Sequence, residues 1–112
     1  NMAQNFRNYK MREIGTAATD IPDGANFDSF DCLISIRMTN ITDNAITADA
    51  YIQNSSLNYY LIKGVTIPAH SSLELIDGGS KIVVVSGDRL YFESDTATSL
   101  DVVVSAVDAI ST

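Results

Sequence analysis

Few side chains in this sequence are suited to catalysis, and they are not grouped. His70 is the only histidine among the 112 residues, and its neighbours, Pro68-Ala69 and Ser71-Ser72, are typical of a turn. A Ser-His-Asp triad needs a serine and an aspartate within hydrogen-bond reach of the imidazole, and no spacing in the chain fixes such a geometry. The nucleophile-elbow pattern Gly-x-Ser-x-Gly is absent. We therefore expect no catalytic residue and a protein that is not an enzyme.

Metal-binding chemistry is weakly marked as well. Structural zinc takes four Cys, His or carboxylate ligands, and this chain has one histidine and one cysteine, Cys32. Asp77, Asp95 and Asp101 fall where loops or strand ends are expected and offer the oxygen ligands that calcium prefers. No Asp-x-Asp-x-Asp-Gly loop contains them, so solvated turn aspartates are the favoured interpretation, and calcium stays open. We assign no metal and no cofactor.

Cys32 stands alone, so it cannot form an internal disulfide. It lies in an apolar alternation and is expected to be a small buried hydrophobe. Pairing across a dimer is the minor alternative, because a reducing cytosol disfavours it. The first residues contain no apolar signal region, so we expect the chain to be made and kept in a cytosol.

The charge of the chain is unevenly distributed. The net charge is -7, yet Arg7, Lys10 and Arg12 give the first twelve residues +3, which leaves -10 for the remaining hundred. An acidic body repels phosphates, so no nucleic-acid partner is expected. No apolar run approaches the roughly 20 residues that span a bilayer, so no membrane partner is expected either.

The basic segment also carries aromatic side chains and is a candidate contact with a second copy. It could form an edge strand, or an extended arm that docks on the acidic body of a neighbour; a solvated tail is the alternative. The candidate oligomer contacts are Phe6, Arg7, Tyr9, Lys10 and Arg12.

Most of the chain alternates between apolar and polar residues with a period of two, and turn residues recur every 8 to 12 positions. This pattern predicts an all-β protein, an antiparallel β-sandwich that is Ig-like or a jelly roll, with about seven strands. The strands are expected near residues 32–41, 45–53, 58–67, 72–76, 81–86, 89–93 and 100–107. We divide the chain into an N-terminal arm and turn region, 1–26, and a sandwich domain, 27–112.

The same alternation selects a hydrophobic core. In the first predicted strand we place Ile34 and Ile36 on the apolar face, together with Cys32 and Met38. The full predicted core is Ile34, Ile36, Ile46, Ile52, Leu61, Leu75, Val83, Leu90, Phe92, Val102 and Val104.

Tyrosines offer the one plausible small-ligand surface. Four tyrosines could present ring faces on which sugars stack, although core or interface packing explains them equally well: Tyr51, Tyr59, Tyr60 and Tyr91. A glycan- or receptor-binding module is therefore the alternative function.

Residues 39–105 contain a series of short motifs that resembles a known family. The motifs are N-I-T at 40–42, I-T-A-D-A-Y-I at 46–52, Y-Y-L-I-K at 59–63, I-P-A at 67–69, S-S-L at 71–73, G-G at 78–79, K-I-V at 81–83, G-D at 87–88 and S-L-D-V-V-V-S at 99–105. In this order of strands and turns the chain resembles small structural proteins of tailed bacteriophages, including those of marine and cyanobacterial hosts.

The resemblance implies assembly rather than chemistry. Proteins of this kind are virion parts such as head decoration, neck, tail or fibre-associated components. The implied partners are further copies of the chain, with a trimer suggested by the phage analogy, and other virion proteins. The implied location is the virion, after synthesis in the host cytoplasm.

Overall fold

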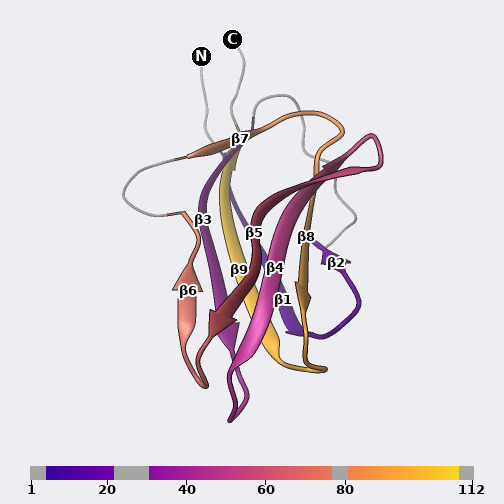
Figure 1. The fold of residues 1–112 in the computed structure, drawn as a ribbon. Coiled ribbons are helices and arrows are strands. Elements are labelled where there is room, and N and C mark those ends of the chain that lie inside the picture. The colour runs from indigo at the N-terminus through magenta and orange to yellow at the C-terminus, as the bar shows by residue number, and fades with distance from the viewer. Residues whose placement is uncertain (1–4, 22–30, 77–80, 109–112) are drawn as a thin grey trace.

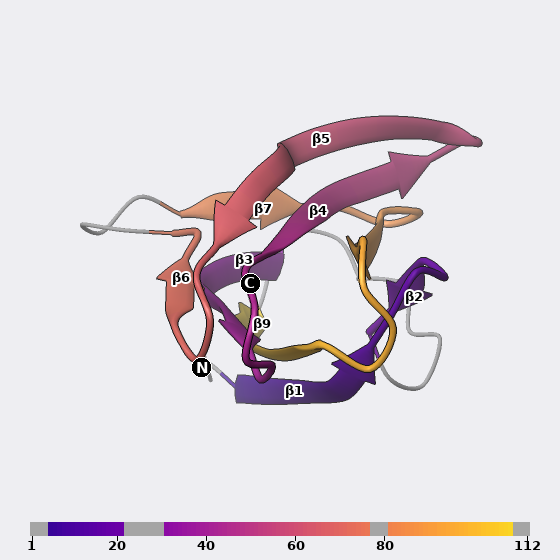
Figure 2. The ribbon, with the colours of Figure 1, turned by 60° about the horizontal axis from the view of Figure 1, so that its bottom comes forward.

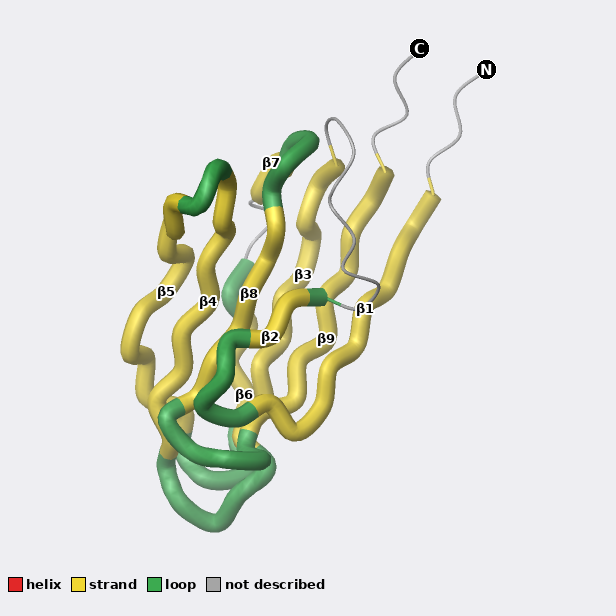
Figure 3. Tube along the Cα trace, turned by 90° about the vertical axis from the view of Figure 1, so that its right-hand side faces the viewer, coloured by secondary structure: helices red, strands yellow, loops and turns green. Residues whose placement is uncertain are grey.

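The computed structural model describes residues 5–21, 31–76 and 81–108, and these form an antiparallel β-sandwich (Figure 1). The five-stranded sheet contains β1 (Asn5–Ile14), β9 (Leu100–Asp108), β3 (Asp31–Asn40), β6 (Ser72–Glu74) and β7 (Ile82–Val84). The four-stranded sheet contains β2 (Thr19–Asp20), β8 (Arg89–Ser94), β4 (Ile46–Asn54) and β5 (Leu57–Ile67). The two sheets face each other as separate layers (Figure 3).

The strand order is that of a jelly roll. β1 pairs with β9, β2 with β8, β3 with both β6 and β7, and β4 with β5, all antiparallel. These nested pairs describe one long hairpin whose two arms roll up together, and the β9–β3 and β8–β4 pairs join its halves into two sheets. Of the two sandwich topologies that the sequence left open, the structure therefore has the jelly roll.

The predicted strands are present, and the N-terminal segment adds two more. The seven predicted ranges correspond to β3 to β9, of which β6 and β7 are shorter than expected because each pairs with only three residues of β3. β1 is an edge strand that pairs with β9 from Asn5 to Ile14. Of the alternatives for the basic N-terminal segment, the edge strand describes residues 5–14. The predicted boundary between the N-terminal region and the sandwich domain, at residues 26 and 27, lies outside the described residues.

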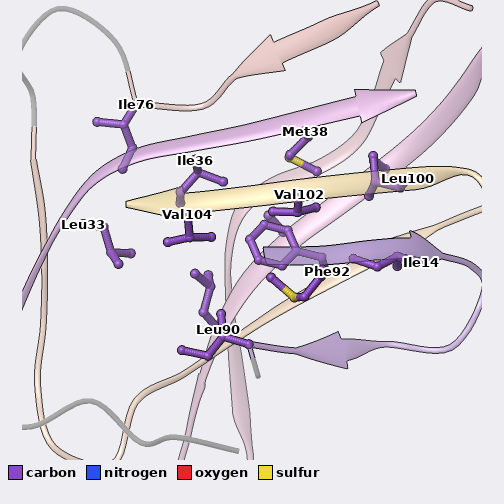
Figure 4. Packing of buried hydrophobic residues seen from close by; sticks show 14 of the residues in the cluster. Ile14, Leu33, Ile36, Met38, Ile76, Leu90, Phe92, Leu100, Val102 and Val104 are labelled. Atoms are coloured by element: carbon purple, nitrogen blue, oxygen red, sulfur yellow. The ribbon is translucent and has the colours of Figure 1, made fainter. Parts of the chain in front are cut away.

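The space between the sheets is filled by apolar side chains from both layers (Figure 4). Its largest fully buried members include Phe92, Leu33, Ile36 and Met38. Of the predicted core, the structure buries Ile36, Ile46, Leu90, Phe92, Val102 and Val104. The other predicted core residues in strands or beside them, Ile34, Ile52, Leu61 and Leu75, are only half-buried.

Two core predictions are wrong in an informative way. β3 has a register irregularity between Leu33 and Ser35, which reverses the alternation, so that Leu33 is fully buried while Ile34 and Cys32 are half-buried. Val83 is 58% exposed, because its neighbour Val84 takes the inward position on the short edge strand β7. Where consecutive residues of a strand are all apolar, the sequence does not show which of them face the core.

The two ends of the sandwich differ in chemistry. One end carries the loops 41–45, 68–71 and 95–99 (bottom of Figure 1). The Nδ2 of the buried Asn40 lies within hydrogen-bond distance of the carbonyls of Asn44, Ile67 and Pro68 (2.7, 2.9 and 3.1 Å), which ties two of these loops together. We call this the loop end. The opposite end holds the start of β1, the start of β5 and β7, and we call it the apolar end.

Candidate functional site

His70 lies at the loop end and is exposed. Its Nε2 is 2.7 Å from Oδ1 of Asp43, and both side chains are largely in solvent. The backbone of His70 has a φ of 56°, which fits the turn that the sequence predicted. The pair bridges two surface loops, and no hydrogen bond joins the imidazole to a serine among the described residues.

The predicted loop aspartates that the structure describes accept hydrogen bonds from backbone amides and do not group together. Oδ1 of Asp95 accepts hydrogen bonds from the Thr47 amide (3.0 Å) and the Thr96 hydroxyl (2.9 Å), and these bonds lower the pKa of Asp95. Asp101 accepts from the amide of Glu13 at 2.9 Å. Asp77 lies outside the described residues. Within the described part of the chain, no three His, Cys, Asp or Glu side chains come together as metal ligands would.

Tyrosines form a continuous row on the outer face of the four-stranded sheet. Tyr51 of β4 is paired in register with Tyr60 of β5 on one side and with Tyr91 of β8 on the other. The ring centroids of Tyr51 and Tyr60 are 5.0 Å apart, and those of Tyr51 and Tyr91 are 5.3 Å apart with the rings nearly parallel. Tyr51 is only 6% exposed, so this row buries its central ring on the outside of the sheet.

Charged side chains border the tyrosine row. The Nζ of Lys63 lies 4.4 Å from the centre of the Tyr60 ring and 3.9 Å from Asp49. At the other side Arg89 forms an ion pair with Asp20. Burial, and then the negative charge of Glu93, raise the pKa of Tyr51. The central ring of the row is therefore packed and neutral.

This packing covers part of the ring surface that a sugar could use, although Tyr60 stays 42% exposed. Tyr51 and Tyr91 cover each other, and Lys63 lies over Tyr60. Tyr59, which we grouped with Tyr51 and Tyr91, is not in the row: it pairs with Ile52 on the inner side of the sheet and is 57% exposed near the start of β5. Tyr60, the fourth tyrosine that the sequence indicated, is in the row, because irregular pairing between β4 and β5 sets which of two adjacent tyrosines faces outward.

The predicted contact residues of the N-terminal segment all lie on β1. Tyr9 packs against the core, while Phe6, Arg7, Lys10 and Arg12 are exposed. Arg12 forms an ion pair with its neighbour Glu13 at 3.0 Å. The three basic residues lie on one edge strand, but Arg7 is paired with the buried Ala106 and Lys10 with the exposed Val103, so these two belong to opposite faces of the sheet.

A row of apolar side chains crosses the outer face of the five-stranded sheet at the apolar end. Val107 of β9 is paired with Phe6 of β1 on one side and with Cys32 of β3 on the other, and Cys32 is paired with Val83 of β7. Side chains paired in this way lie side by side on one face of a sheet. Phe6 is 72% exposed, so this face is the outer one. We call these four residues the apolar row.

Comparison with known proteins shows similarity at the level of fold. No protein-family model matches the chain, and no curated protein matches it. One matching solved structure comes from Bacillus endospore appendages, which form disulfide-linked pili. It aligns with a TM-score of 0.58 and 11% identity, over 97% of this chain and 88% of that one. A chain of the VP2 subviral particle of infectious bursal disease virus aligns with a TM-score of 0.22 and 13% identity, over 94% of this chain and 42% of that one. At these identities the pilus chain supports the fold alone.

The described residues include no helix that is long and apolar enough to cross a membrane.

Proposed function

We propose that this protein is a non-enzymatic structural subunit that acts by self-association. The observation that carries the proposal is the position of its exposed apolar side chains. Eight large hydrophobic side chains are exposed among the described residues, and six of them lie at the apolar end, in β1, in the start of β5 and in or next to β7. The six are Phe6, Leu57, Tyr59, Tyr60, Val83 and Val85.

Apolar side chains that cluster in contact with water are unfavourable, and binding another molecule would remove them from water. Single exposed apolar residues are ordinary, but a concentration of them at one end of a small domain marks a surface that another molecule covers. Leu57 and Tyr59 are exposed at the start of β5. The β4–β5 hairpin extends beyond the neighbouring strands (Figure 2). The long edge strands β1 and β5 also favour association, because their free N–H and C=O groups can pair with another chain.

The likeness to a pilus chain is compatible with this proposal. That chain comes from disulfide-linked pili, and the structural match extends over nearly all of this chain. One fold serves many functions, so the likeness supports a structural role without specifying it.

The finer proposal is that the assembly is a tailed-phage virion. It depends on the resemblance of residues 39–105 to small virion proteins, whose strand-and-turn order the segment shares. Mass spectrometry of purified virions of a phage that encodes the chain tests it directly. We expect the chain in the particles at a fixed ratio to the major structural proteins, and its absence from them would reject the virion assignment while leaving self-association open.

Self-association itself is tested by static light scattering across a concentration series. We expect a mass that is a multiple of 12.1 kDa at micromolar concentration. The number of copies, including the trimer suggested by the phage analogy, follows from the plateau mass. A mass of one chain at every concentration and salt would overturn the proposed function.

A further inference from the structure

The outer face of the five-stranded sheet has a second row parallel to the apolar row. Val103 of β9 is paired with Lys10 of β1 and with Arg37 of β3, and Arg37 is paired with Glu74 of β6. Lys10 and Arg37 are exposed, and Val103 is 39% exposed between two fully buried valines, so this row also faces outward. We call it the charged row. Ser105 and Ser35, which are paired with each other, lie between the two rows.

Both rows are complementary to themselves. Consider a two-fold axis that runs parallel to the strands, outside the sheet and midway between β9 and β3. Rotation about this axis stacks a second copy face to face on the first. In the stack β1 lies opposite the partner's β6/β7 edge, and β9 lies opposite the partner's β3. Phe6 then lies opposite the partner's Val83, and Val107 lies opposite the partner's Cys32. An isologous contact of this kind uses the same patch on both copies.

The charged row matches under the same rotation. Lys10 at one edge comes opposite the partner's Glu74 at the other, and the symmetry makes this contact twice. Lys10 has no ion pair within the described part of its own chain. The carboxylate of Glu74 lies 3.8 Å from Arg37 and accepts hydrogen bonds from the Ser35 hydroxyl and from the Ile36 and Ile76 amides, so its position is fixed while its side chain stays 26% exposed. Complementary charges at fixed positions select one register of two stacked sheets.

The absence of acid from these positions also favours contact between copies. The chain carries a net charge of -7, so two copies repel each other over most approaches. The apolar row and the line of Asn8, Ser105 and Ser35 beside it contain no acidic residue. This face can therefore approach its own copy without placing like charges together.

We propose that a second copy of this chain packs on the outer face of the five-stranded sheet about this two-fold axis, with Phe6 against the partner's Val83 and Lys10 against the partner's Glu74. The contact deepens the self-association proposed above and rests on it. Two sandwiches joined in this way form a four-layered dimer with one sheet-on-sheet interface between them, at the spacing of about 10 Å that packed sheets adopt.

The first test uses a size exchange. Phe6→Val removes contact area and should weaken the dimer at least about tenfold. Val83→Phe places two large rings opposite each other and should weaken it similarly. Combining Phe6→Val with Val83→Phe restores one large and one small residue at each contact, and the dimer affinity should return to within about threefold of wild type. Ile41→Ala, an exposed apolar position at the loop end, is the matched control and should leave affinity unchanged.

The exchange is diagnostic because the two residues are far apart within one chain. β1 and β7 are separated by β9 and β3, so Phe6 and Val83 lie about 14 Å apart at about 4.8 Å per strand. Substitutions at such a distance add independently. Rescue in the double variant therefore requires that the residues meet between copies, and strict additivity would overturn the proposed contact.

The second test uses charge. Lys10→Glu sets two carboxylates opposite each other and should weaken the dimer at least about tenfold. Lys63→Glu makes the same change in net charge on the other sheet and is its control. Equal loss of affinity in both variants would show general repulsion only and would overturn the Lys10–Glu74 contact.

The third test uses Cys32 as a native reporter. The axis sets the two Cys32 Cα atoms about 11 Å apart, from an offset of one strand and the spacing between sheets, and the two sulfurs, which both point into the interface, lie closer together than that. A short bismaleimide should join wild-type chains into covalent dimers and should fail with Cys32→Ser. If light scattering shows an oligomer while all three tests are negative, the two-fold contact is wrong and self-association stands. A monomer at all concentrations would reject both.

Discussion

The irregularity in β3 makes a sharp prediction about two adjacent residues. Leu33 is fully buried between the sheets, while Ile34 is half-buried. Leu33→Ala should lower the free energy of unfolding by about 2 to 5 kcal/mol, because it leaves a cavity in the core. Ile34→Ala should cost clearly less. Urea denaturation monitored by circular dichroism measures both, and an equal or larger loss for Ile34→Ala would contradict the assigned phase of β3.

Asp95 predicts how stability responds to acid. Its pKa is lowered in the folded protein, chiefly by the amide hydrogen bond from Thr47. A carboxyl whose folded pKa lies below its unfolded value contributes stability above the unfolded value and loses it as pH falls through the folded one. The ordinary pKa of an aspartate, which we take for the unfolded chain, is 3.8. The stability difference between wild type and Asp95→Asn should therefore be constant near neutral pH and shrink below about pH 4.

Urea denaturation at a series of pH values measures this difference. Asp43→Asn is a useful comparison, because Asp43 is exposed on a neighbouring loop and bonds His70 rather than a backbone amide. A difference between wild type and Asp95→Asn that stays constant down to pH 2 would show that Thr47 does not stabilise the ionised form.

At the scale of elements, β1 belongs to the sandwich rather than lying apart as an arm. Met11 and Ile14 are buried in the common core, and β1 pairs with β9 along most of its length. Deleting residues 1–12 should therefore lower the melting temperature strongly, in addition to any effect on association. Thermal unfolding followed at low protein concentration separates the loss of fold from the loss of oligomer.

The sequence could predict the strands because alternation and turn residues are local signals. Seven ranges correspond to β3 to β9 for this reason. It could not predict which face of β3 or β5 points inward, because one extra residue in a strand reverses the alternation beyond it. Of the two adjacent tyrosines that the sequence indicated, Tyr60 joins the tyrosine row and Tyr59 does not, and Leu33 replaces Ile34 in the core, through this effect.

The candidate surfaces depended even more on tertiary structure. The basic side chains of β1 could be found from spacing, since they are close in sequence. The apolar row joins Phe6, Cys32, Val83 and Val107, which are far apart in sequence and meet only through the pairing of four strands. Alternation predicted that Cys32 and Val83 lie inside, and neither is fully buried.

The whole molecule is organised by pairs that close progressively longer loops. β4 and β5 are joined by a tight turn, whereas β1 and β9 pair at opposite ends of the chain, for example Asn5 with Asp108. Closing a longer loop costs more entropy, and the outer pairs can form cheaply only after the inner ones have brought their ends together. We expect refolding in milliseconds to seconds, as for other β-proteins rich in distant contacts.

This order of closure predicts how core substitutions divide between folding and unfolding rates. Ile46 of β4 pairs with Ile67 of β5 near the centre of the nested hairpin, and Ile46→Val should slow refolding because that pair forms early. Met11 of β1 pairs with Val102 of β9 in the outermost pair, and Met11→Ala should mainly accelerate unfolding because its contacts form late. Stopped-flow tyrosine fluorescence across a urea series gives both rates. If Met11→Ala slowed refolding as much as Ile46→Val for the same loss of stability, the outer pair would already be formed in the transition state, and the jelly roll would not close from its centre outward.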